Sequence, residues 1–366
     1  METNLSEINF TYYDKKKYIL HTSEGRYFII SNEKKKEMEK ILNSDDLELR
    51  EELLNKINSL ESKEKNSLMY FADFQFKKTI IPKQLMSKIC NPFKFMFNEY
   101  VLTIIAVFLI SFLSYSYLIL EPNFSNNVSY LKYSWCILFF VFFVHEIGHA
   151  TACVRFNVKA GDVGFGITSF LPVLYANVTD AWRLSKKERI IVNLGGIYFQ
   201  NLMSLCLLIV SFLMSNMDLY FIAKIIFIST VFQFFPFHKS DGYWILSDVI
   251  SQPNLFKYSR EIFQTLLKNP FSEKDKKIWM FAFYYILING IIYFFVIRTG
   301  VRFWDYIINM PFYLYDSLII VINKQWSLIV FDINYVWAIM YLVFTSKMIL
   351  NNIKSYTKSK GADKVE

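Results

Sequence analysis

The chain has 366 residues, of which 54% are hydrophobic and 19% are aromatic, and its formal net charge is +8. This apolar content exceeds that of ordinary soluble enzymes, and several runs are long enough to cross a bilayer, so a polytopic α-helical protein of the cell membrane is expected. Residues 1–98 contain 17 Lys and Arg against 15 Asp and Glu, a near balance that argues against nucleic-acid binding.

Residues 1–76 predict a small α+β domain in the cytosol. Two strand-like runs, residues 18–22 and 26–30, flank a glycine-containing turn and predict a hairpin. Two helices are expected to follow, over residues 34–42 and 47–60. A hairpin followed by short helices resembles the winged-helix elements that capture extended leader peptides in enzymes modifying ribosomally made peptides. A cytosolic regulatory or folding domain is the alternative.

The next segment leads into the membrane. Residues 77–99 combine five lysines with aromatic residues and predict a juxtamembrane linker on the cytoplasmic side. The first span is expected over residues 100–120. The loop 121–131 has no Lys or Arg, so it is placed outside, and the second span, residues 132–153, then runs inward.

The second predicted span carries an H-E-x-x-H motif near its cytoplasmic end, formed by His145, Glu146 and His149. Residues four apart share a helix face, so the two histidines can bind one metal ion. Zinc accepts imidazole nitrogens and usually takes a third protein ligand together with a water molecule. Glu146 adjoins the first histidine, where it can take a proton from that water. Burying these polar groups within an apolar run is costly, which favours a functional site over a chance match.

The sequence of residues 155–189 does not predict a simple membrane-spanning helix. Three glycines precede a run at 173–178 whose composition favours extended backbone, which predicts a strand or hairpin that dips partly into the membrane beside the site. An exposed strand edge there would let a protease hold its substrate as an added strand. A plain cytoplasmic loop is the alternative.

The third span is expected over residues 190–214. Its Gly195 and Gly196 allow close packing of helices. Asn193 and Asn201 are candidate residues for supporting the site, because a polar group in a span can face the catalytic helix.

The fourth span, residues 219–237, runs inward and ends on the same side as the second motif histidine. Asp241 is a candidate third zinc ligand just beyond it. Pro236 and Gly242 would break the helix and let that carboxylate turn toward the metal. His238, three residues earlier, competes for the same role, and the local pattern alone does not choose between the two.

The C-terminal part continues the membrane domain, which is expected over residues 100–350. A fifth span is predicted at 278–296 and a sixth at 327–350. The run 312–322 is too short to cross and is expected to be interfacial or packed against protein. A basic tail, residues 351–366, follows. Six spans place both termini in the cytoplasm.

The motifs together resemble the site-2 protease family of intramembrane zinc metalloproteases over about residues 130–250. The resemblance implies a site-2-protease-like helical core with Zn²⁺ as cofactor. It also implies that His145, His149 and Asp241 bind the ion and that Glu146 activates water.

The family's second motif is commonly N-x-x-P-x-x-x-x-D-G. Pro236 and the pair Asp241 and Gly242 match this spacing, which favours Asp241 over His238. Gln233 stands where the Asn is expected, which puts the role of that Asn in substrate positioning in question.

Residues 241–248 and 179–184 are similar to segments of peptide zinc metalloproteases found with ribosomal-peptide biosynthesis genes. That branch has a cytosolic N-terminal region and no PDZ domain, and no candidate PDZ insertion is found here. The resemblance implies maturation of a leader-bearing peptide, with a peptide exporter as a candidate partner. The alternatives are regulated intramembrane proteolysis of a membrane-anchored regulator, and a catalytically silent zinc-containing protein that binds peptides or serves transport.

Overall fold

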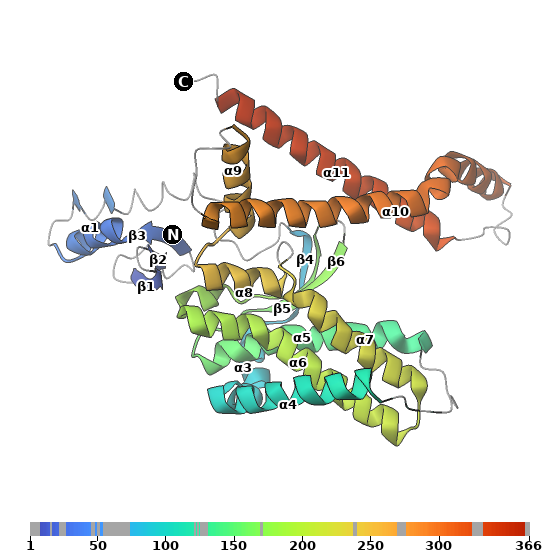
Figure 1. Cartoon of the computed structure of the whole chain (residues 1–366), viewed down its shortest axis with the longest axis horizontal. Helices are drawn as coiled ribbons and strands as arrows, with labels where there is room; N and C mark the ends of the chain where they lie inside the picture. Colours follow the sequence, from blue (N-terminus) through green and yellow to red (C-terminus); the bar gives the residue numbers. More distant parts are fainter. Residues whose placement is uncertain are drawn as a thin grey trace. The chain divides into compact units, whose positions relative to one another are not determined.

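The computed structural model divides the chain into two units, residues 1–168 with 172–258, and residues 169–171 with 259–366 (Figure 1). The residues that it describes are 8–14, 17–21, 27–44, 48–49, 52–53, 74–120, 122, 124, 131–168, 171–236, 240–268, 276–323 and 332–362. Most of them are helical, and two small sheets lie in the first unit. The H-E-x-x-H motif and the predicted third ligand also belong to the first unit.

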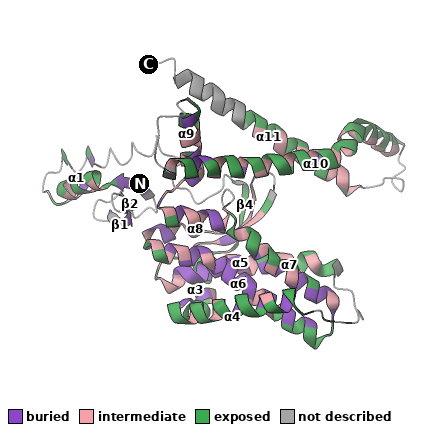
Figure 2. Ribbon diagram, viewed as in Figure 1, coloured by how far each residue is buried: buried purple, intermediate pink, exposed green. Residues whose placement is uncertain are grey.

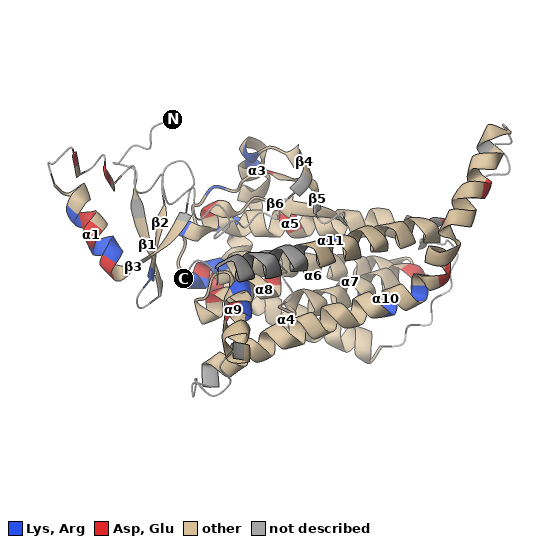
Figure 3. Ribbon diagram, turned by 90° about the horizontal axis from the view of Figure 1, so that it is seen from above, with Lys and Arg blue, Asp and Glu red and all other residues tan. Residues whose placement is uncertain are grey.

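Five helices of the described chain are long and apolar enough to cross a membrane. They are α4 (Glu99–Leu118), α5 (Ser134–Arg155), α6 (Lys186–Leu213), α7 (Met217–Phe234) and the stretch Ile278–Ile320 of α10 (Lys276–Ile322). This set agrees with the predicted polytopic membrane protein and is one short of the six expected spans. Charged residues are sparse along α4–α7, whereas α1 (Asn32–Leu42) carries both signs of charge (Figure 3).

The second unit differs most from the prediction. The run 312–322 is the last part of α10, a helix of 47 residues with Pro311 inside it, and whether this part is interfacial or packed against protein stays a prediction. A proline removes one backbone hydrogen bond and bends a helix without having to end it. At about 1.5 Å per residue, α10 is about 70 Å long, more than twice the thickness of the hydrocarbon core. The predicted sixth span corresponds to the shorter apolar stretch Asn334–Leu350 of α11 (Ile333–Ala362).

The N-terminal sheet contains β1 (Asn9–Asp14), β2 (Lys17–His21) and β3 (Tyr27–Ser31), all antiparallel in the order β1-β2-β3. The predicted hairpin is confirmed as the β2–β3 pair, in which His21 lies opposite Tyr27. The sequence reading missed β1. The predicted helix at 34–42 is α1, whereas the one at 47–60 lies largely outside the described residues.

A second sheet is built from segments far apart in the chain. It contains β4 (Phe74–Ile81), β5 (Val163–Thr168) and β6 (Leu171–Ala176), in the order β4-β5-β6. The hairpin expected within 155–189 is therefore present. The expected linker 77–99 is instead structured, since it contributes to β4 and then forms α3 (Lys83–Cys90) and a 3₁₀ helix (Asn91–Phe97).

Helix α6 is the most buried of the five candidate spans, and it packs between α5 and α7 (Figure 2). Its start is fixed by a capping box, in which Ser185 and Glu188 satisfy each other's backbone N–H groups. Gly148 of α5 and Gly195 of α6 bring the two backbones into contact, because a Cβ at Gly148 would overlap the Gly195 carbonyl oxygen. Close packing was predicted for Gly195, and this contact confirms it.

Candidate metal centre

The two motif histidines point into the protein from one face of α5. His145 and His149 are each only 7% exposed, and their ring centroids lie 4.8 Å apart. Their Nε2 atoms are 3.1 Å from each other. The i, i+4 spacing that predicted a shared face is therefore realised as a pair of converging imidazole nitrogens.

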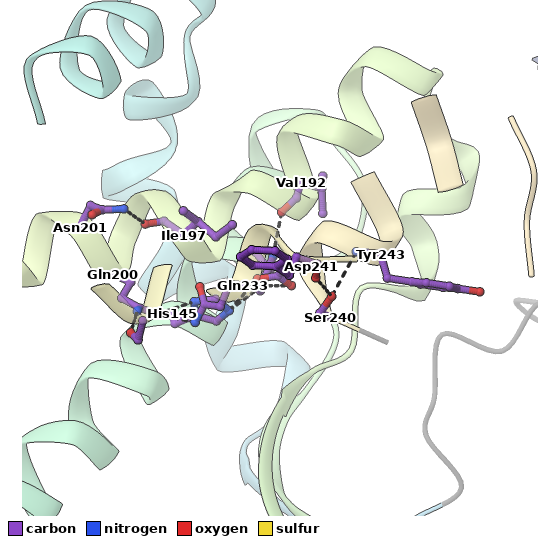
Figure 4. Close-up of polar contacts among 12 residues, drawn as sticks. His145, Val192, Ile197, Gln200, Asn201, Gln233, Ser240, Asp241 and Tyr243 are labelled. Carbon is purple, nitrogen blue, oxygen red and sulfur yellow. Dashed lines mark hydrogen bonds and ion pairs between the residues drawn. The ribbon is translucent and has the colours of Figure 1, made fainter. Parts of the chain in front are cut away.

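Asp241 meets this pair from another helix. It is the first residue of α8 (Asp241–Ile250), whose N-cap Ser240 accepts a hydrogen bond from the Tyr243 N–H at 3.1 Å. One carboxylate oxygen of Asp241 lies 3.2 Å from His145 Nε2, and the other lies 3.4 Å from His149 Nε2 (Figure 4). The carboxylate therefore closes a three-residue group whose candidate ligand atoms lie within 4.8 Å of one another.

Gly242 explains why a glycine follows this aspartate. A Cβ at Gly242 would overlap the carbonyl oxygen of Phe234 at the end of α7 and would lie 2.8 Å from that of Gln233. A residue with a side chain would push the start of α8 away from α7. The D-G pair thus combines a candidate ligand with the close helix contact that places it.

The donor set suits a zinc ion. Ligand atoms about 2.0–2.1 Å from a tetrahedral zinc lie about 3.3 Å from one another. The two Nε2 atoms are 3.1 Å apart, His145 Nε2 lies 3.2 Å from one Asp241 oxygen and His149 Nε2 lies 3.4 Å from the other. With one ligand atom taken from each residue, the three atoms lie within 4.8 Å of one another. Gly196 of α6 leaves the necessary room, because a Cβ there would overlap His149 Nε2 and lie 2.5 Å from His145 Nε2. Two imidazoles and one carboxylate with this spacing could hold a zinc ion at a single point.

The remaining ring nitrogens are held by groups of α6. His149 Nδ1 lies 2.8 Å from the Val192 carbonyl oxygen, which can only accept a hydrogen bond. His145 Nδ1 lies 3.1 Å from Gln200 Oε1. Gln200 Nε2 donates to the Ile226 carbonyl at 3.1 Å, which fixes the orientation of the amide. Both contacts favour a proton on Nδ1, which would leave both Nε2 lone pairs available to a metal ion at the candidate site.

Gln200 is the functional residue that the sequence reading passed over. Gln233 Nε2 also donates to Gln200 Oε1, at 2.8 Å. Gln233, which stands where the Asn was expected, therefore helps to hold Gln200, and Gln200 in turn contacts His145. Val192, Gly196 and Gln200 are spaced at i, i+4 and i+8 on the face of α6 toward the histidines. That spacing is the signal that could have identified Gln200.

Asn201 and Asn193 were predicted to support the site, but the hydrogen bonds that the structure shows for them run to other residues. Asn201 donates to the Ile197 carbonyl of its own helix at 2.8 Å (Figure 4). Asn193 donates to Asp248 at 3.4 Å, at the opposite end of α8. His238 lies outside the described residues. Glu146 is partly buried and adjoins His145 on α5.

Electrostatics differ at the two ends of α8. Burial alone would raise the pKa of Asp241, but in the metal-free protein the protonated forms of His149 and His145, together with a hydrogen bond from His145, hold it below its usual range. Asp241 is thus a carboxylate at neutral pH, the form that binds a metal. Burial raises the pKa of Asp248, and the facing Arg189 and Lys186 charges offset only part of that rise.

Replacing Gln200 with Leu is expected to weaken zinc binding by about 10–100-fold, because His145 then loses the acceptor that fixes its tautomer. Zinc affinity measured by competition with a chelator checks this. Asn201→Leu is the matched control, since it changes the neighbouring amide of α6, which bonds to Ile197. Equal weakening by both variants would assign the effect to helix packing rather than to the hydrogen bond on His145.

A Bacillus subtilis (strain 168) protein named "Putative peptide zinc metalloprotease protein YydH" is 28% identical to this chain over 202 residues. The aligned region covers 54% of this chain and 75% of that protein. No family model matches the chain, and no solved structure matches it. The similarity supports a metalloprotease-like function, while the site-2 protease relationship stays a prediction.

Proposed function

We propose that this chain is a membrane-embedded zinc metallopeptidase that hydrolyses a peptide bond. The observation that carries the proposal is the convergence of His145, His149 and Asp241, whose candidate ligand atoms lie within 4.8 Å of one another, as the ligands of one zinc ion must. Glu146 adjoins this group on α5, within a helix long and apolar enough to span a membrane. The similarity to a protein named as a peptide zinc metalloprotease supports the same class.

Zinc held by these residues would supply Lewis-acid polarisation of the peptide carbonyl and would make water more acidic. Glu146 accepts a proton from the attacking water as the new carbon–oxygen bond forms. It then passes that proton to the leaving nitrogen as the carbon–nitrogen bond breaks, so the carboxylate is regenerated. Val192 and Gln200 keep both imidazoles in the tautomer that binds metal throughout.

The substrate in this proposal is a ribosomally made peptide that carries a leader segment, bound in extended form. Strands β5 and β6 follow α5 in the chain and form a sheet with β4, whose outer strands among the described residues are β4 and β6, and an extended peptide can add to such an outer strand. The N-terminal sheet would receive the leader, and a peptide exporter is the proposed partner. The proposed topology keeps both termini in the cytoplasm, on the side to which newly made peptide is delivered.

The zinc content of purified protein tests the proposal. Wild type is expected to hold about one zinc per chain, with loss in His145→Ala and Asp241→Ala and retention in His238→Ala. Loss of zinc in His238→Ala and retention of zinc in Asp241→Ala would make His238 the third ligand and would leave the proposed class, a zinc metallopeptidase, unchanged. A well-folded preparation that holds no zinc would contradict the proposal. Zinc retained without cleavage of any candidate peptide would favour the catalytically silent alternative.

A further inference from the structure

Helix α8, which presents Asp241 to the histidines, is fixed at both ends by the membrane helices. Its first turn contacts α7 through Gly242. Near its other end, Asp248 accepts a hydrogen bond from Arg189 Nε of α6 at 2.7 Å. Lys186 also donates to the Val249 carbonyl at 2.6 Å. The position of the candidate third ligand therefore depends on contacts along the whole of α8.

A third set of contacts comes from the N-terminal sheet. Tyr13 of β1, Ile19 of β2 and Trp182 form a buried apolar cluster, with Ile29 and Trp244 packed against it. We call these five residues the docking cluster. Trp244 lies on α8, one turn after Asp241. The sheet thus reaches the helix that carries the candidate ligand.

Two rings of the docking cluster also contact Arg189, the cation that pairs with Asp248 near the far end of α8. The Arg189 guanidinium lies 4.8 Å from the ring centroid of Tyr13 and 5.4 Å from that of Trp182. Arg189 is only 2% exposed, and its Nη2 has no hydrogen-bond partner among the described residues. Cation–π contacts with the two rings therefore help to stabilise the buried guanidinium of Arg189, which its hydrogen bonds satisfy only in part.

Two polar contacts lie beside the docking cluster. Thr11 Oγ1 of β1 donates to the Arg183 carbonyl at 3.3 Å. Lys17 Nζ of β2 donates to Gln252 Oε1, just beyond α8, at 3.4 Å. Apolar packing, a cation–π contact and hydrogen bonds thus all connect the sheet to the segments that hold α8.

We propose that the N-terminal sheet controls the metal centre, because its docking holds α8 where Asp241 meets His145 and His149. Zinc affinity then depends on whether the sheet is docked. By linkage, zinc binding strengthens the docking of the sheet to the same degree. A peptide that binds the sheet would change the third ligand's position without touching the ion. This inference rests on the proposed function, since it assigns a regulator to the proposed zinc site.

The test compares Tyr13→Ala with Tyr12→Ala in the full-length protein. Tyr13 is 1% exposed in the docking cluster, whereas its neighbour Tyr12 is 55% exposed. We expect Tyr13→Ala to weaken zinc binding by about tenfold or more, and Tyr12→Ala to change it by less than about twofold. Competition with a chelator gives both affinities. Equal affinity of Tyr13→Ala and wild type would overturn the proposal while leaving the zinc site in place.

Amide hydrogen exchange provides a second readout. In zinc-free protein, Tyr13→Ala is expected to speed exchange in α8, and zinc added to wild type is expected to slow exchange in β1. The wild-type experiment needs no variant, so it decides the matter if Tyr13→Ala does not fold. Exchange in β1 that does not respond to bound zinc overturns the proposal. Faster exchange in α8 of Tyr13→Ala, in a protein that binds no zinc, would support docking while contradicting the proposed function.

Discussion

Replacing Glu146 with Gln is expected to lower the rate of peptide hydrolysis by about 10²–10⁴-fold, because the amide cannot accept a proton from water. Zinc content is expected to stay at about one ion per chain, since the proposed ligands are His145, His149 and Asp241. Loss of turnover with retained metal would distinguish a proton-transfer role from a ligand role. Cleavage kinetics and zinc content, measured on the same preparation, provide both quantities.

Glu99→Gln is the matched control for this experiment. Glu99 is an exposed carboxylate at the start of α4, where it pairs with Lys187 Nζ at 2.9 Å. The same chemical change there is expected to leave cleavage within about twofold of wild type, because exposed ion pairs contribute little. A Glu146→Gln protein that still cleaves its peptide at the wild-type rate would exclude the proposed mechanism.

Replacing Gly196 with Ala is expected to abolish zinc binding while α6 remains helical. The added Cβ would overlap His149 Nε2 and would lie 2.5 Å from His145 Nε2, so the methyl group takes the space in which both nitrogens converge. Alanine favours helix over glycine by about 0.8–1.0 kcal/mol, so the backbone of α6 is not expected to suffer. Zinc content, together with the helix signal in circular dichroism, checks both parts.

Gly290→Ala is the control for the glycine change. Gly290 also lies inside a long apolar helix, α10, and a Cβ there would meet nothing within 4 Å in the described structure. This variant is expected to bind zinc as wild type does. Stoichiometric zinc of wild-type affinity in Gly196→Ala would mean that the ion does not lie between the two Nε2 atoms.

The candidate site was largely readable from the sequence because its geometry is local. Residues four apart on a helix must share a face, so the sequence spacing alone predicts that His145 and His149 lie together. The approach of Asp241 was expected from the alternation of spans and from the helix-breaking residues around it. Gln200 was missed because three amides lie close together on α6, and only the packing of α5 decides which one meets a histidine.

The fold differs from the prediction in two places. One is the pairing of strands that are far apart in the sequence, and the other is the length of the helix that contains the fifth span. Strand β4 pairs with β5, with Phe74 opposite Thr168, and no local sequence pattern predicts a partner so far along the chain. The fifth span was predicted to end at residue 296. However, α10 continues past this residue.

The contact between Gly148 and Gly195 has a consequence for the order in which the ligands close. His145 and His149 both lie on α5, and their Nδ1 atoms contact α6, which the touching backbones hold against α5, so we expect the imidazole pair to keep its spacing in the metal-free protein. The carboxylate belongs to a different helix, the ten-residue α8, which contacts α7 at Gly242 and α6 through Arg189 and Lys186. We therefore expect an incoming zinc ion to bind the two imidazole nitrogens first and the Asp241 carboxylate last. On release, the bond to the carboxylate would break first.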